Sequence, residues 1–152
     1  MDAPYHILLA EGHKQLRQEI IRIISLMQGT TLSGVVGSGR ELNEFLERFA
    51  SDLLIMDICL PGVRALNAVQ EIRGRHPQLK ILILTADRDP EYLVQATAAG
   101  ANGCLPNEEA DLELPQAIDA LRRGETYRSS RMAARVREKI SDLSLAPQKP
   151  FL

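Results

Sequence analysis

The sequence predicts a doubly wound α/β domain built on a parallel sheet, and three features of the chain support that prediction. Short apolar runs alternate with segments of helical periodicity five times between residues 6 and 124. Nearly all of these runs are apolar at consecutive positions, as in strands that helices cover on both faces of a sheet. The chain has 152 residues, of which 45% are hydrophobic and 25% are charged, so it can bury one core of ordinary composition.

Five strands are expected from the apolar runs. In chain order they lie at residues 6–10, 31–36, 53–56, 81–84 and 101–105. Gly12 follows the first run and Pro61-Gly62 follows the third, as is typical of the turns that end strands.

Five helices are expected between and after the strands. Their apolar residues recur three and four positions apart, as in the stripe formed by Leu42, Phe45, Leu46 and Phe49. The fourth helix has the clearest start, because Asp89-Pro90-Glu91 supplies an N-cap, a proline at the first helical position and an acid in the first turn. In chain order the helices cover 13–28 and 41–49, run from Leu66 to a stop at His76-Pro77, start at Asp89, and cover Leu114 to Leu121.

Composition excludes several classes of protein. Lys and Arg total 18 against 20 Asp and Glu, and the net charge of -2 argues against a uniformly basic nucleic-acid binder. The two cysteines, Cys59 and Cys104, cannot form a disulfide framework or a metal cluster, and we expect both to be small buried hydrophobes. No secretory signal is visible, and no apolar run approaches the roughly 20 residues that span a bilayer. These observations predict a cytoplasmic protein without a membrane contact.

Polar side chains follow four of the expected strands. They are Glu11, Asp57, Thr85 and Asn107. Ligands of open parallel sheets bind beyond the carboxyl ends of the strands, so we expect these side chains to share one site. Carboxylates and a hydroxyl suit a hard cation such as Mg²⁺, and an aspartate can also accept a phosphoryl group as a nucleophile.

Several short motifs occur in a familiar order and spacing. They are ILLAE at residues 7–11, LIMD at 54–57, LPG at 60–62, LTA at 84–86, GANG at 100–103 and ALRRGETY at 120–127. Over about residues 5 to 128 the sequence resembles the receiver domain of a two-component response regulator of the NarL/FixJ (LuxR-like) family. That resemblance implies a flavodoxin-like (CheY-like) sheet of five strands in the order 2-1-3-4-5.

The resemblance also implies roles for the strand-end residues. Asp57 corresponds to the phosphoacceptor, Glu11 and Asp57 to ligands of Mg²⁺, and Thr85 to the switch hydroxyl. The phosphoryl group would come from a histidine kinase, so the domain is expected not to be an enzyme beyond transfer to its own Asp57. Members of this family commonly form homodimers and bind DNA through a further, C-terminal domain. A homodimer is therefore expected, through a face that includes Leu93, Ala96, Ala117 and Leu121 in part.

The chain departs from the family pattern at the expected site. Gly12 stands where the family has a second acid, Asn107 replaces the usual lysine, and Cys104 replaces the aromatic switch residue. One lost ion pair is worth roughly 4 kcal/mol at an effective dielectric of about 20, whereas an amide hydrogen bond returns about 1 kcal/mol. We therefore expect Mg²⁺ to bind weakly and phosphorylation of Asp57 to be weak or absent. A conventional phospho-accepting receiver and, as a different class, a small flavin- or nucleotide-binding domain stay open as alternatives.

The expected organisation is a receiver domain over residues 1–126, followed by a linker helix and tail over 127–152. The helix is marked by Met132, Val136, Ile140 and Leu143, and the tail carries two prolines. The segment is expected to lead to a DNA-binding domain that this chain does not contain.

Overall fold

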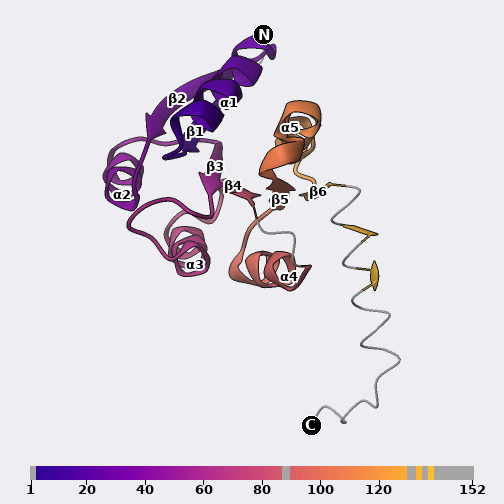
Figure 1. Ribbon diagram of the computed structural model, residues 1–152. Coiled ribbons are helices and arrows are strands. Elements are labelled where there is room, and N and C mark those ends of the chain that lie inside the picture. Colours follow the sequence, from indigo (N-terminus) through magenta and orange to yellow (C-terminus); the bar gives the residue numbers. More distant parts are fainter. Residues whose placement is uncertain (1–2, 87–89, 130–132, 135–136, 139–152) are drawn as a thin grey trace.

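The computed structural model describes residues 3–86, 90–129, 133–134 and 137–138. Within them the strands are β1 (Tyr5–Ala10), β2 (Thr30–Val36), β3 (Leu53–Asp57), β4 (Lys80–Thr85), β5 (Gly103–Pro106) and β6 (Tyr127–Arg128). The helices are α1 (Lys14–Leu26), α2 (Gly39–Arg48), α3 (Ala65–Arg75), α4 (Pro90–Ala99) and α5 (Ala110–Arg122), with a single 3₁₀ turn, η1 (Asn107–Glu109), before α5. The alternation of strand and helix that the sequence predicts is confirmed (Figure 1).

All strands lie in one parallel sheet with the order β2-β1-β3-β4-β5-β6. The expected order 2-1-3-4-5 is confirmed, but the expectation of five strands is wrong by one. The additional strand β6 has only two residues, which pair with Gly103 and Cys104 of β5. A two-residue strand has no hydrophobic alternation of its own, so periodicity could not reveal it.

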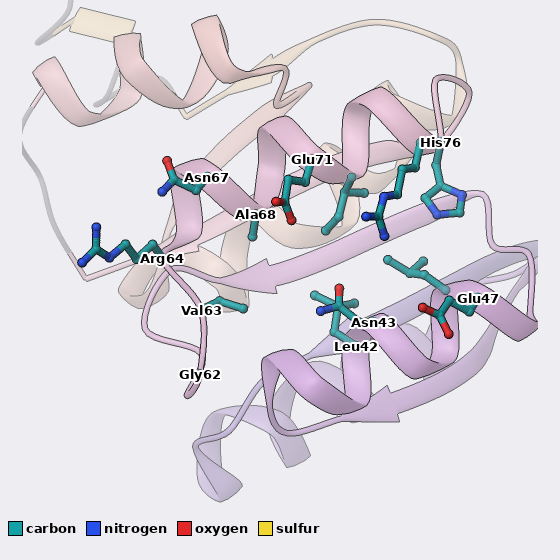
Figure 2. Close-up of a pocket in the computed structure, with 13 residues that line it drawn as sticks. Leu42, Asn43, Glu47, Gly62, Val63, Arg64, Asn67, Ala68, Glu71 and His76 are labelled. Atoms are coloured by element: carbon teal, nitrogen blue, oxygen red, sulfur yellow. The ribbon is translucent and has the colours of Figure 1, made fainter.

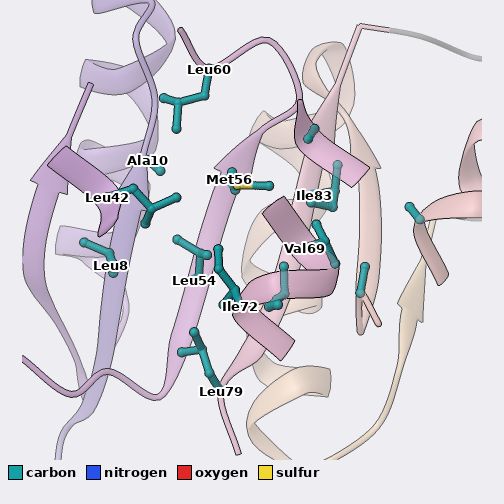
Figure 3. Packing of buried hydrophobic residues seen from close by; sticks show 14 of the residues in the cluster. Leu8, Ala10, Leu42, Leu54, Met56, Leu60, Val69, Ile72, Leu79 and Ile83 are labelled. Carbon is teal, nitrogen blue, oxygen red and sulfur yellow. The ribbon is translucent and has the colours of Figure 1, made fainter. Parts of the chain in front are cut away.

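Two hydrophobic clusters cover the two faces of the sheet, as alternation along buried strands requires. Residues such as Leu8, Leu54 and Ile83 face α2, α3 and α4 (Figure 3), whereas Ile7, Ile55 and Leu84 face α1 and α5. Figure 1 shows this division of the helices between the two sides of the sheet. The carboxyl ends of the strands are left between these two helical layers.

Helix starts follow local capping chemistry. His13 is the N-cap of α1, and its Nδ1 accepts a hydrogen bond from the backbone N–H of Leu16 at 3.4 Å. Ser38 caps α2 in the same way through the N–H of Glu41. Helix α5 begins at Ala110, four residues before the apolar pattern predicts, because the turn η1 leads directly into it.

The four residues expected on the dimer face are core residues. Leu93, Ala96, Ala117 and Leu121 are each at most 1% exposed, so they contact the sheet and not a second chain. An apolar period marks the buried face of a helix, and the residues of a contact surface lie on the opposite face. The large apolar side chains that α4 and α5 do expose include Val94 and Leu112.

The carboxyl-terminal segment is described only in part. The sheet continues past residue 126, because Tyr127 and Arg128 form β6. Met132, Val136, Ile140 and Leu143, which mark the expected linker helix, lie outside the described residues. Among the described residues, no helix has the length and apolar character needed to cross a membrane.

Candidate functional site

A cleft of about 710 Å³ opens beside the carboxyl ends of β1, β3 and β5. It is lined by Gly12, His13, Gln15, Leu16, Glu19, Asp57, Cys59, Pro61, Asn107 and Glu108. Among these described lining residues there are carboxylates but no lysine or arginine. The cleft is therefore a region of negative charge that holds two of the four strand-end residues predicted from the sequence.

Asp57 ends β3 at the base of the cleft and is 7% exposed. Its Oδ1 accepts a hydrogen bond of 2.9 Å from the backbone N–H of Cys59, which is the local turn that an aspartate forms with the residue two positions on. This turn fixes the carboxylate at the edge of the sheet, where one face stays open to the cleft. The position suits a group that must be both held and reachable.

Glu11, directly after β1, is fully buried against Asp57. Its Oε1 accepts a hydrogen bond of 2.9 Å from the N–H of His13, and its Oε2 has no hydrogen-bond partner among the described residues. Burial and the neighbouring Asp57 carboxyl raise the pKa of Glu11 to about 8. Glu11 therefore holds its proton more tightly than an exposed glutamate does.

Gly12 occupies the position next to Glu11 and is closely surrounded. A Cβ atom there would lie 3.1 Å from Cδ of Pro61 and 3.2 Å from the carbonyl oxygen of Gly37. An acid at this position would have to displace the Pro61 ring by a few tenths of an ångström. The site therefore has two carboxylates at its centre. The close packing around position 12 favours a glycine next to them.

Thr85 and Asn107 meet in a smaller hollow next to the cleft. Thr85 is fully buried at the end of β4, where it pairs with Pro106 of β5. Both Thr85 and Asn107 line a hollow of about 150 Å³, and Asn107 also lines the larger cleft with Asp57. Asn107 Oδ1 is buried and accepts no hydrogen bond from the described residues. Asn107 thus connects the two hollows, so the structure brings all four predicted residues to one edge.

The structure corrects the expectation for one cysteine. Cys104 is buried as expected, and burial raises the pKa of its thiol to about 12. Cys59 is exposed and lines the cleft, and its backbone N–H binds Asp57. The turn spacing from Asp57 could have revealed this, since the residue two positions after a strand-end aspartate normally lies in a surface turn.

Mg²⁺ is the ion that this donor set would suit. Within the described part of the chain, no group of three or more His, Cys, Asp or Glu side chains is arranged to hold a metal. Mg²⁺ is commonly held by only one or two protein carboxylates together with water and phosphate oxygens. Glu11 and Asp57 fit that minimal pattern, because Glu11 presents a buried Oε2 without a donor next to the Asp57 carboxyl.

A second hollow, of about 500 Å³, lies between α2 and α3 (Figure 2). Its floor is apolar, with Leu42 and Ile72, and its rim carries Glu47, Glu71 and Arg75. None of the four strand-end residues Glu11, Asp57, Thr85 and Asn107 lines it. The chemistry therefore concentrates at the carboxyl edge of the sheet.

The chain is similar to known regulators along most of its length. It matches the family described as response regulator receiver domain over residues 7–119. It is 29% identical over 130 residues to the transcriptional regulatory protein YxjL of Bacillus subtilis, covering 86% of this chain and 60% of that protein. It is 31% identical over 122 residues to the oxygen regulatory protein NreC of Staphylococcus aureus, covering 80% of this chain and 56% of NreC.

A solved structure of the RcsB response regulator of Salmonella typhimurium superimposes with a TM-score of 0.88 at 20% identity, covering 96% of this chain and 73% of RcsB. At that identity the likeness shows the fold alone. The chain spans between 56% and 60% of the length of YxjL and NreC. The family match does not favour a flavin- or nucleotide-binding domain. The chain belongs to the response regulator receiver domain family, and its relatives are NarL/LuxR-type transcriptional regulators of two-component systems.

Proposed function

We propose that this receiver domain works mainly through protein contacts and that Asp57 accepts a phosphoryl group weakly or not at all. The observation that carries the proposal is the absence of any lysine or arginine among the described residues that line the cleft around Asp57. A phosphoryl group brings a charge of about -1.5 to -2. No lysine or arginine among the described cleft-lining residues would face that charge, and Arg17 acts on Glu11 from outside the cleft lining. Charge stabilisation is usually the largest contribution to such a transfer.

Each strand-end residue has a place in this proposal. Asp57 is the residue that a phosphoryl donor would modify, and Thr85 is the hydroxyl at the adjacent hollow that would turn toward it. Asn107 offers an amide N–H₂ in place of a cation. Glu11 and Asp57 would hold Mg²⁺, whose charge would partly offset that of the phosphoryl oxygens.

Partners follow from the family and from the relatives. A histidine kinase is the proposed phosphoryl donor, and the protein is not an enzyme toward any other substrate. Solved structures include two RcsB dimers bound to two parallel DNAs. We extend to this chain a homodimer, control of transcription in the cytoplasm, and DNA binding through a C-terminal domain that follows residues 127–152.

Intact-protein mass after incubation with acetyl phosphate and Mg²⁺ tests the proposal directly. We expect less than about one tenth of the adduct that a conventional receiver gives in the same time, and none in Asp57→Ala. In Asn107→Lys we expect the rate to rise about tenfold or more, because a cation then faces the new charge. Complete modification of the unaltered chain at Asp57 would contradict the proposal and establish the conventional phospho-accepting receiver.

A further inference from the structure

Two buried acceptor atoms near Asp57 have no hydrogen-bond donor among the described residues. Glu11 Oε2 and Asn107 Oδ1 are both buried without a hydrogen-bond partner among the described residues. A buried polar atom without a partner costs about 1–3 kcal/mol, and such atoms are few in native proteins. Glu11 Oε2 lies against the Asp57 carboxyl, and that interaction together with burial raises the pKa of Glu11. Asn107 Oδ1 has no such neighbour, and its residue lines the cleft beside Asp57, so a ligand that supplies donors would satisfy it.

The charge of the cleft defines the sign of that ligand. Glu19 and Asp57 line it together with Glu108, and the described lining residues include no lysine or arginine. His13, the one basic residue among them, is already engaged, since its Nδ1 caps α1 and its backbone N–H binds Glu11. A ligand that brings donors and a positive charge is complementary to this surface, whereas an anion is not.

The size and lining of the cleft favour a cation on an apolar stem. A volume of about 710 Å³ is far larger than one metal ion needs. Leu16, Cys59 and Pro61 add an apolar part to the wall. A lysine side chain matches both features, because its ammonium has three donors and no acceptor and its four-carbon stem packs along apolar surface.

We propose that the cleft receives a lysine side chain of a protein partner, whose ammonium donates hydrogen bonds to the Asp57 carboxylate and to Asn107 Oδ1. Gly12, His13, Gln15, Cys59 and Pro61 form an exposed rim, which gives the partner's backbone a surface to lie on. This inference rests on the proposed function, since it names the chemistry of one of the protein contacts through which the domain would work.

A peptide titration of the full chain tests the inference. The probe is a blocked Gly-Gly-Lys-Gly-Gly peptide, and the matched probe is the same peptide with an acetylated lysine, which keeps the stem and loses the charge. Backbone amide NMR signals of His13, Cys59 and Asn107 are expected to shift with the first peptide, with a Kd on the order of 1 mM. The acetylated peptide is expected to leave these signals unchanged.

Variants separate binding in the cleft from general attraction to acidic surface. Asp57→Asn is expected to weaken the peptide at least about fivefold, because the acceptor that remains is neutral. Asn107→Lys is expected to abolish binding by filling the cleft from within. Glu44→Gln removes an exposed carboxylate of α2 outside the cleft and is expected to change nothing. Preserved dispersion of the amide spectrum shows that each variant is folded.

Three results would overturn the inference. They are shifts equal in size with the acetylated peptide, an equal loss of affinity in Glu44→Gln and Asp57→Asn, and no shift at about ten times the expected Kd. The mass assay with acetyl phosphate is independent of the peptide, so weak phosphorylation without peptide binding would reject this inference and leave the proposed function standing.

Discussion

The two edges of the sheet differ in how the carbonyl, amide and carboxyl oxygens around them find hydrogen-bond donors. At the amino edge, Arg73 near the end of α3 donates to the carbonyl oxygens of His76, Pro77, Leu79 and Gly100 and to Oδ1 of Asn102, at distances from 2.5 to 3.3 Å. At the carboxyl edge, Oε2 of Glu11 and Oδ1 of Asn107 accept no hydrogen bond from described residues. One edge has a donor for each of these acceptors, and the other has acceptors left over.

This difference separates a structural network from a functional site. Arg73 ties the end of α3 to the start of β4 and to the loop before β5, and Asn102 Oδ1 also accepts from the N–H of Ile81. Because these acceptors already have donors, the network fixes the positions of α3, β4 and the loop before β5, and it offers a ligand no unpaired acceptor to bind. Unsatisfied groups cost stability unless something binds them, so they mark the place where binding can occur.

Removing the guanidinium of Arg73 should have the largest effect. Arg73→Met keeps most of the stem and strands the backbone acceptors, so the free energy of unfolding should fall by about 3 kcal/mol. The measurement is urea unfolding followed by circular dichroism. Arg75→Met, two residues further on an exposed part of the same helix, is the control and should stay within about 0.5 kcal/mol of the parent. Equal losses in the two variants would break the comparison.

Sequence reasoning located the functional edge but not the structural one. Asp57, Thr85, Glu11 and Asn107 follow from one rule, since strands of a parallel sheet expose their carboxyl ends together. The role of Arg73 has no local signature. It depends on Gly100, whose φ of +118° turns a carbonyl toward the guanidinium and whose missing Cβ would lie 2.9 Å from Cγ of Arg73.

The same limit explains the details that the sequence could not supply at the candidate site. The exposure of Cys59 follows from the turn after Asp57, and the general preference of cysteine for the interior pointed the wrong way. The unsatisfied atoms of Glu11 and Asn107 are visible only once neighbouring strands are in place. A residue type and its position along the chain define what a group can do, whereas its partners depend on tertiary packing.

Asp57→Asn should act in the opposite direction to Arg73→Met. Removing one of two adjacent carboxylates should raise the free energy of unfolding by about 1 kcal/mol at pH 8. The gain should shrink toward pH 5. The raised pKa of Glu11 means that the folded chain takes up a proton that the unfolded chain lacks, so stability falls as the pH rises from about 4.5 to about 8.

The check is unfolding of the parent and the variant in EDTA at several pH values. The parent should lose stability across that range, and the slope should be flatter in Asp57→Asn because the neighbouring charge is gone. Glu44→Gln should leave the slope unchanged. If Asp57→Asn were as destabilising as Arg73→Met, the carboxyl edge would be a structural network like the amino edge.

Breaking the contact between β6 and α5 should have a small effect on stability, no larger than that of Asp57→Asn. The hydroxyl of Tyr127 donates a hydrogen bond of 2.9 Å to Oε1 of Glu113, and burial together with Glu113 raises the pKa of that tyrosine. Tyr127→Phe keeps the ring against the core and removes one donor, so unfolding should become easier by about 1 kcal/mol. Hydrogen exchange adds a sharper readout, since the N–H of Tyr127 binds the carbonyl oxygen of Asn102 at 3.0 Å. Faster exchange of that amide alone would show that the side-chain bond holds β6 on the sheet, whereas a loss as large as that of Arg73→Met would place β6 in the amino-edge network.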